Sequence, residues 1–195
     1  MHALWRCFPS LTQKADPLAS SALQPGDLVG VQESKGNQLA VVESLQGSKA
    51  RLKLGFDRKS VVLPQRQLDL ICPLPSGAEL PDGLGASPWH LKAEQLDLSR
   101  LDRRSWGAAW LLLLESDEMV EIDFFSDLVC GGTNPSQLAL CWLALMGPQL
   151  WFRYKQDQIK ARSAGELKPL RRQQRLKALE QQIEQRWKKL LSARQ

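Results

Sequence analysis

The stretch "LWFRYKQDQIKAR", residues 150–162, decides how the second half of this 195-residue chain is interpreted, because it mixes aromatic with basic side chains. Side chains along a β-strand point alternately to its two faces. We interpret the stretch as a β-hairpin, with strands at about 150–155 and 158–162, that has one buried face and one exposed, basic face. Because its turn lacks glycine, we expect a connection wider than two residues, with Asp157 as the best turn residue. The faces of the first strand carry Leu150, Phe152 and Tyr154 on the core side and Trp151, Arg153 and Lys155 on the exposed side.

Three helical segments precede this hairpin. The clearest runs from Asn134, a good N-cap that is followed by proline, to Gly147. A shorter helix is expected from Asp123, as its N-cap, to Gly131. A longer one follows residue 95, with apolar residues at helical spacing. We expect the tryptophans on these helical stripes to lie in the core; they are Trp106, Trp110 and Trp142.

Three helices followed by a β-hairpin is the order of a winged-helix domain, which we place at 95–165 with the hairpin as its wing. The third helix has no Lys or Arg between Asn134 and Gly147. A helix that reads the major groove of DNA normally presents basic or amide side chains. A DNA-binding regulator is therefore a weak interpretation of this domain.

Residues 26–72 predict a small β-barrel of the SH3/KOW or OB type. Short runs rich in Val and Leu alternate with the turn-forming segments "SKGN", "QGS" and "FDRK". The run "KARLKL", residues 49–54, alternates strictly, so it is expected to be a half-buried strand with a basic outer face. The fold class predicted for the whole chain is α+β.

The remaining segments divide the chain further. Residues 73–94 are rich in Pro and Gly, which disfavour helix and sheet, so they predict an inter-domain linker in which Trp89 suits either packing or ligand contact. Residues 166–195 predict one long, basic, amphipathic helix whose apolar stripe needs a partner. Residues 1–25 lack the apolar segment of a secretory signal and are expected to be a disordered N-terminus, with a transit peptide as the alternative.

Charge is segregated along the chain, whose formal net charge is +5. Residues 79–130 hold eleven acidic and four basic residues, whereas 166–195 hold nine basic and three acidic ones. An acidic middle between basic ends suggests that contacts with anions are made at the ends. The longest apolar runs are far too short to cross a bilayer, so we expect no membrane partner. Because the N-terminal segment does not resemble a secretory signal, we expect a cytoplasmic protein. The four cysteines are isolated from one another, which predicts buried thiols and no metal site.

The order of these parts resembles the N-terminal region of ribonuclease II-type (RNB-family) exoribonucleases, in the form found in cyanobacteria. The resemblance rests on "PGDLVGV" and "LAVVES" in the barrel, the Pro/Gly linker, "SWGAAWLLLLE", "NPSQLALCWLAL" and the hairpin, and it covers roughly residues 25–190. In that family a catalytic barrel binds magnesium through clustered aspartates and degrades RNA from the 3′ end, while N-terminal modules guide the strand. No such aspartate cluster follows the winged-helix-like region here. The resemblance therefore implies a non-catalytic, RNA-guiding region with no catalytic residue and no cofactor of its own.

The basic strand faces are the candidate RNA-binding surface, through attraction to phosphates and stacking of bases. We expect single-stranded RNA as the ligand, and a protein or a catalytic domain packed on the 166–195 helix. A protein-interaction adaptor, built from the winged helix and a coiled-coil helix, and a nucleic-acid-binding regulator are the alternatives. The candidate nucleic-acid-binding residues are Lys49, Arg51, Lys53, Arg58, Lys59, Arg66, Trp151, Arg153, Tyr154, Lys155, Lys160 and Arg162.

Overall fold

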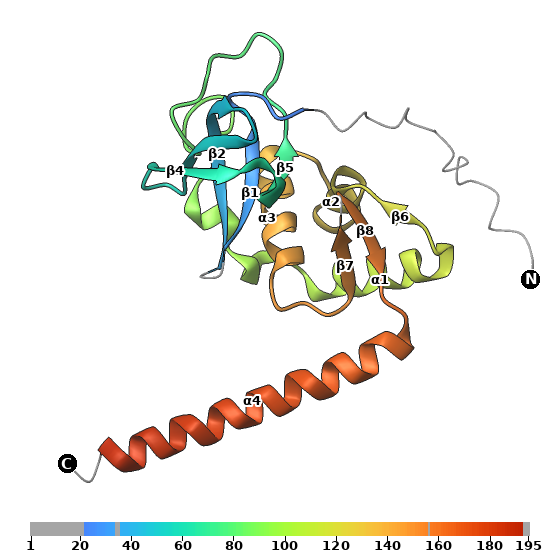
Figure 1. Ribbon diagram of the computed structural model, residues 1–195. Helices are drawn as coiled ribbons and strands as arrows, with labels where there is room; N and C mark the ends of the chain where they lie inside the picture. The colour runs from blue at the N-terminus through green and yellow to red at the C-terminus, as the bar shows by residue number, and fades with distance from the viewer. Residues whose placement is uncertain (1–21, 34–35, 156, 193–195) are drawn as a thin grey trace, which may run out of the picture.

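The computed structural model describes residues 22–33, 36–155 and 157–192, and shows an α+β protein with two antiparallel sheets and four α-helices in that part of the chain (Figure 1). The predicted α+β class is confirmed. The expectation of a disordered N-terminus falls almost wholly on residues outside the described ones. None of the helices in the described ranges combines the length and the apolar composition that a membrane crossing requires.

The first sheet has five strands in the order β4-β3-β2-β1-β5. Its two end strands do not pair with each other, so the sheet is open and the closed small barrel predicted for residues 26–72 is not found. A single 3₁₀ turn, Gln65–Gln67, joins β4 to β5. The strand predicted at residues 49–54 is present with these bounds. The sequence did not predict that the last strand of this sheet pairs with the first. The strands are β1 (Leu28–Glu33), β2 (Gly36–Gln46), β3 (Lys49–Leu54), β4 (Lys59–Pro64) and β5 (Leu68–Cys72).

Both faces of this sheet are apolar at its centre, because neighbouring residues of β1 and β2 point to two different clusters. Val29, Val31 and Val42 belong to a cluster that the five-stranded sheet forms on one of its faces. Leu28 and Val41 belong to a larger cluster that continues into the helices. One hydrophobic cluster therefore joins the sheet to the helical half, and the proposed division into domains stays a prediction.

The helical half contains three helices and a second sheet in the order β6-β8-β7. The helix–helix–helix–hairpin order predicted from the sequence is present, and a two-residue strand between the first two helices was missed. The elements are α1 (Arg103–Ser116), β6 (Met119–Val120), α2 (Ile122–Cys130), α3 (Pro135–Met146), β7 (Phe152–Lys155) and β8 (Gln158–Ala161), preceded by 3₁₀ turns at Ala93–Leu96 and Leu98–Arg100.

Two local predictions were wrong. The N-cap of α2 is Glu121, so Asp123 lies in the first turn, although Gly131 ends the helix in the left-handed conformation as expected. In the hairpin, Lys155 pairs with Gln158, so two residues join the strands and the turn is no wider. Asp157 takes a φ of 58°, which asparagine and aspartate tolerate better than most residues, and this explains how the tight turn forms without glycine.

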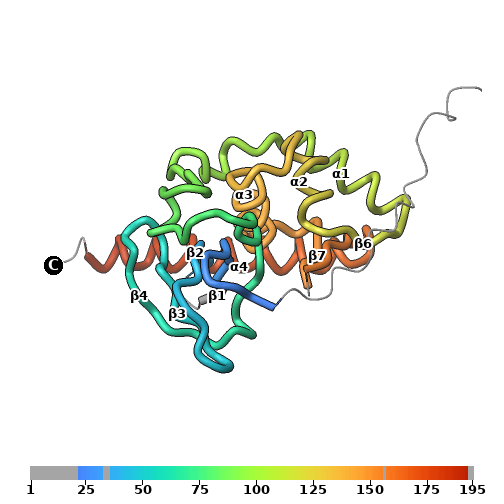
Figure 2. Tube along the Cα trace, turned by 90° about the horizontal axis from the view of Figure 1, so that it is seen from above, coloured from blue at the N-terminus to red at the C-terminus, as the bar shows by residue number. Residues whose placement is uncertain are grey.

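Helix α3 occupies the centre of the molecule, between the five-stranded sheet and α2 (Figure 2). Its start carries the predicted cap: the Asn134 side chain accepts from the Gln137 N–H at 2.9 Å. The fully buried Trp142 faces the sheet, where a Cβ on Gly30 would lie 2.2 Å from its indole carbons. The expectation that Trp106 and Trp142 are core residues is confirmed, whereas Trp110 is only half-buried.

The Pro/Gly segment 73–94 forms no strand or α-helix, yet it packs on the core. Leu84 and Leu91 are buried in the shared cluster. Trp89 is buried as well, and its indole N–H donates to the Gly26 carbonyl at 3.1 Å. Trp89, for which the sequence left packing and ligand contact open, is therefore a packing residue.

The long C-terminal helix, α4 (Ala164–Ser192), is confirmed and begins two residues before the predicted start. It begins near the hairpin and runs below the rest of the molecule in the view of Figure 1. Leu167 is its one buried residue, and every residue from Arg171 to Ser192 is exposed. The helix is therefore anchored at its first turns.

Cys130, the last residue of α2, contacts Cys141, in the middle of α3, and their Sγ atoms lie 3.3 Å apart. Both are thiols, as is the half-buried Cys72. Cys7 lies outside the described residues.

Candidate nucleic-acid interface

The hairpin β7–β8 presents the two faces that its alternation predicts, with one exception. Phe152 and Ile159 are fully buried, and Arg153 and Lys155 are exposed. Trp151 was expected on the exposed side, but it is half-buried because its ring packs edge-to-face on Trp110, with ring centres 5.7 Å apart. The expectation of a freely exposed Trp151 was wrong.

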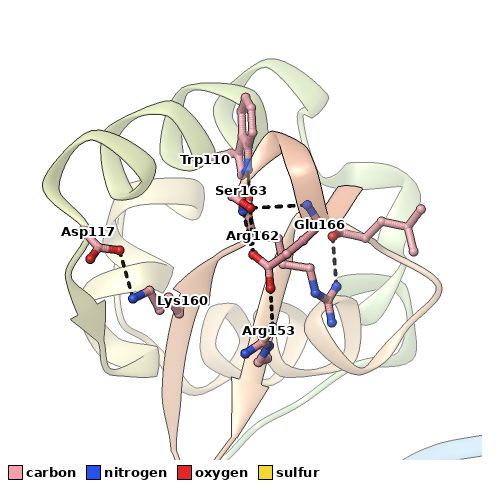
Figure 3. A network of polar contacts seen from close by, with 8 residues as sticks. Trp110, Asp117, Arg153, Lys160, Arg162, Ser163 and Glu166 are labelled. Carbon is pink, nitrogen blue, oxygen red and sulfur yellow. Dashed lines mark hydrogen bonds and ion pairs between the residues drawn. The ribbon is translucent and has the colours of Figure 1, made fainter. Parts of the chain in front are cut away.

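Arg153 is held by an ion pair across the start of α4. Its guanidinium donates to the Glu166 carboxylate, whose other oxygen accepts the Ser163 N–H at 2.9 Å (Figure 3). The Ser163 N–H and hydroxyl, and then the charge of Arg153, hold the pKa of Glu166 below its usual value. Ser163 and Glu166 form a Ser-x-x-Glu capping box. This local sequence signal could have predicted the hydrogen bond between Glu166 and Ser163, but not the ion pair with Arg153.

Arg162 works as an internal brace of the hairpin. Its guanidinium donates to the Leu150 carbonyl at 2.9 Å, and its own carbonyl accepts the Trp110 indole N–H at 2.9 Å (Figure 3). Burial lowers the pKa of Arg162, with the charge of Arg153 as the second cause, yet an arginine stays protonated under such a shift. Its donor groups therefore serve the fold of the hairpin.

The other candidate residues on the hairpin differ in whether their polar groups are free to contact a ligand. Lys160 forms an ion pair with Asp117, at the end of α1, at 2.9 Å (Figure 3). Tyr154 is half-buried and donates its hydroxyl to Asp157 at 2.9 Å, and burial raises its pKa. Lys155 is exposed and makes no ion pair with any described residue.

On the five-stranded sheet, two candidate cations share one carboxylate. Lys53 and Arg58 lie 2.6 Å and 2.7 Å from the two oxygens of Asp82, which comes from the Pro/Gly segment. Lys53, and then Arg58, holds the pKa of Asp82 below its usual value. The Lys53 side chain keeps 23% of its surface exposed. Asp82 therefore offsets one of the two positive charges, and the cluster of three side chains keeps a net charge of +1.

Four candidates on this sheet are exposed and make no ion pair within the described part of the chain. They come from β3, β4 and the 3₁₀ turn that follows. Lys49 and Arg51 share one face of β3, whereas Lys59 pairs with Leu54 and belongs to the other face, and Arg66 lies in the turn that leads to β5. Lys155 lies apart from them on the second sheet. We call them the open cations; they are Lys49, Arg51, Lys59 and Arg66.

A cavity of about 660 Å³ between α4 and the helical half was not foreseen. Trp151 lines it, together with Arg103 of α1 and Arg171 of α4. No sequence signal pairs Arg103 with Arg171, because their proximity depends on where α4 leaves the hairpin. Among the residues that the structure describes, no group of three or more His, Cys, Asp or Glu side chains could hold a metal ion.

Comparison with known proteins found no match: no family model matches the sequence, no curated protein matches it, and no solved structure matches the fold.

Proposed function

We propose that this chain is an RNA-binding N-terminal region of an RNB-family, ribonuclease II-like 3′–5′ exoribonuclease, and that it guides single-stranded RNA without carrying the catalytic site. The order of parts supports the family. Strands β1 to β4 form a meander and β5 returns to β1 after a 3₁₀ turn, which resembles the strand order of an SH3-like barrel although the sheet is open. The succession α1, β6, α2, α3, β7, β8, with sheet order β6-β8-β7, is that of a winged helix.

The observation that carries RNA binding is the set of open cations. A lysine or arginine that has no carboxylate partner can neutralise a phosphate without first breaking an ion pair. Lys49 and Arg51 stand two residues apart on β3, so both side chains lie on one face of the sheet. Two cations on one face of a strand attract the phosphates of any RNA strand, so binding is sequence-tolerant and weakened by salt.

The burial of α3 favours a single strand over duplex DNA. In winged-helix DNA readers the third helix enters the major groove. Here this helix packs against β1, β2 and β5, and seven of its twelve residues are buried. It has no free face to place in a groove, which makes the DNA-binding regulator the weakest alternative.

The alternative function is a protein-interaction adaptor, and the exposed apolar residues of α4 favour it. Its apolar residues lie on one side of the helix and are about half exposed, so they suit a partner helix or a catalytic domain. These residues are Leu176, Leu179, Ile183, Trp187, Leu190 and Leu191.

A filter-binding titration separates the two. Labelled single-stranded RNA of mixed sequence and duplex DNA of the same length are each titrated at low and at high salt. RNA binding at low salt that is weaker for the duplex and falls steeply with salt supports the proposal. Absence of RNA binding at low salt, together with a defined protein complex through α4, would establish the adaptor instead. The family assignment has a separate test, since it predicts that the reading frame continues beyond residue 195 into an aspartate-rich catalytic domain.

A further inference from the structure

The cavity between α4 and the helical half has the size of a small-ligand site. Its volume of about 660 Å³ falls within the range typical of such sites. Its walls come from α1, from the connection between α3 and β7, and from the first turns of α4. Because Leu167 is buried and Arg153 binds Glu166, this part of α4 is fixed beside the cavity.

Trp106, in the wall of this cavity, carries a hydrogen-bond donor without an acceptor. Its side chain is 9% exposed, and its indole Nε1 is buried without a hydrogen-bond partner among the described residues. The indole N–H groups of Trp89, Trp110 and Trp142 all have acceptors. A buried unpaired donor destabilises a fold unless water or a ligand completes it.

The ring of Trp106 is fixed by its neighbours. It packs edge-to-face on Phe125 and Phe152, with ring centres 5.4 Å and 5.3 Å apart. It cannot swing into solvent to find an acceptor without losing both aromatic contacts. Because the Nε1 atom is buried, a water or a ligand acceptor can pair with this N–H only if the neighbouring side chains shift slightly.

Trp151 supplies a rigid aromatic surface in the same cavity. It packs on Trp110, and a Cβ on Gly107 would lie 3.4 Å from its ring, so the ring lies close to the backbone of α1. The side-chain amide of Gln149 donates to the carbonyls of Leu145 and Phe152 and accepts the Phe152 N–H. These hydrogen bonds hold the connection between α3 and β7 in place. Such a fixed indole can take a planar ring in van der Waals contact.

Two cations at the cavity complete the set. Arg103 and Arg171 both line it, and neither makes an ion pair with a described residue. Arg171 is followed on α4 by Arg172 and Arg175, so the local charge is positive. Guanidinium groups bind phosphate oxygens through paired N–H donors.

We propose that this cavity binds one nucleotide of single-stranded RNA. The base lies against Trp151, the phosphate lies between Arg103 and Arg171, and the Trp106 N–H donates to an oxygen of the base or sugar. A nucleotide combines the three groups that these side chains can bind. Its planar base suits Trp151, its phosphate suits the two arginines, and its neutral oxygens suit the Trp106 N–H. The inference rests on the proposed RNA-binding function and adds a specific subsite to it.

The test follows the indole N–H signals of the ¹⁵N-labelled protein by NMR during titration with tetrauridylate and, separately, with uridine 5′-monophosphate. Trp106→Phe, which keeps an aromatic ring, identifies the Trp106 signal. We expect this signal to shift on titration, and Arg171→Gln to weaken tetrauridylate binding about tenfold, as for loss of a charge-assisted hydrogen bond. Arg186→Gln removes the same charge from an exposed site further along α4 and is expected to have a much smaller effect.

The outcomes separate this subsite from the proposed function. If RNA binds but the Trp106 signal stays in place, or if Arg171→Gln and Arg186→Gln weaken binding equally, the subsite is refuted and RNA binding stands. If uridine 5′-monophosphate shifts the Trp106 signal while filter binding detects no RNA, the cavity takes a free nucleotide, and both the RNA subsite and RNA guidance are refuted. If neither probe moves the Trp106 signal and no RNA binds, both are refuted.

Discussion

The indole N–H of Trp142, on α3, donates to the carboxylate of Asp69, on β5, at 3.1 Å. Gln32 on β1 donates to the same oxygen at 2.9 Å. Gly30 pairs with Asp69 in the sheet and leaves the space that the Trp142 ring fills. These contacts attach the helix at the centre of the molecule to the five-stranded sheet, and they bury the surface that a winged-helix DNA reader would use.

Gly30→Ala tests how tightly the sheet and α3 are packed. The new Cβ would lie 2.2 Å from the Trp142 ring, so Trp142 or β1 must move. We expect a loss of about 3 kcal/mol in the free energy of unfolding, at the upper end of the range for overpacked cores, measured by urea denaturation. Gly165→Ala, in the first turn of α4, is the control, because its Cβ has space and alanine favours the helix. An unfolding midpoint for Gly30→Ala equal to that of the wild type would contradict this packing.

Asp69→Asn tests the electrostatics of the same junction. Burial raises the pKa of Asp69, and the hydrogen bonds from Gln32 and Trp142 oppose that rise in part. The folded state therefore binds a proton more tightly than the unfolded state does. The stability that this protonation contributes is fully present below the ordinary pKa of 3.8 and is lost as the pH rises through the folded-state pKa.

Urea midpoints of the wild type and of Asp69→Asn, taken from pH 3.5 to pH 7, should therefore diverge. We expect the wild type to lose stability relative to the variant as the pH rises through this range. A constant difference between the two proteins across the series would mean that Asp69 has an unshifted pKa.

Removal of residues 176–195 tests whether the outer part of α4 contributes to the fold. Every described side chain in this segment is exposed, so the truncated chain should unfold at the same urea concentration as the full chain. Trp187 is 62% exposed, and its fluorescence in the full chain should be quenched readily by iodide. A large drop in midpoint would show that this segment packs on the body.

Local sequence signals predicted the elements well, because a cap or an alternation acts within a few residues. The Asn134 cap set the start of α3, and the alternation of residues 49–54 set β3 and its basic face. The pairing of β5 with β1, the strand β6 and the burial of Trp89 depend on contacts between distant segments, for which a single sequence carries no periodicity. The α+β class and the order of elements could therefore be predicted, but not their packing.

The candidate site was predicted less well, for the same physical reason. A basic residue on a strand face looks identical in sequence whether it is free or paired. Lys53 meets Asp82, 29 residues away, and Lys160 meets Asp117, 43 residues away, so neither ion pair has a local signature. The structure therefore leaves Lys49 and Arg51 as the stronger candidates on β3, and it shows that Arg162 braces the hairpin.

The most direct measurement is the salt dependence of single-stranded RNA binding in two double variants of equal charge. Lys49→Gln with Arg51→Gln removes two open cations, whereas Lys53→Gln with Arg58→Gln removes two that share the Asp82 carboxylate, which offsets one of their two charges. Each phosphate contact contributes about 0.7 to the slope of log K against log salt concentration for single strands. The account predicts a slope shallower by about 1.4 for the first variant and by no more than about 0.7 for the second. Equal slopes in both variants and in the wild type would contradict RNA binding by the open cations.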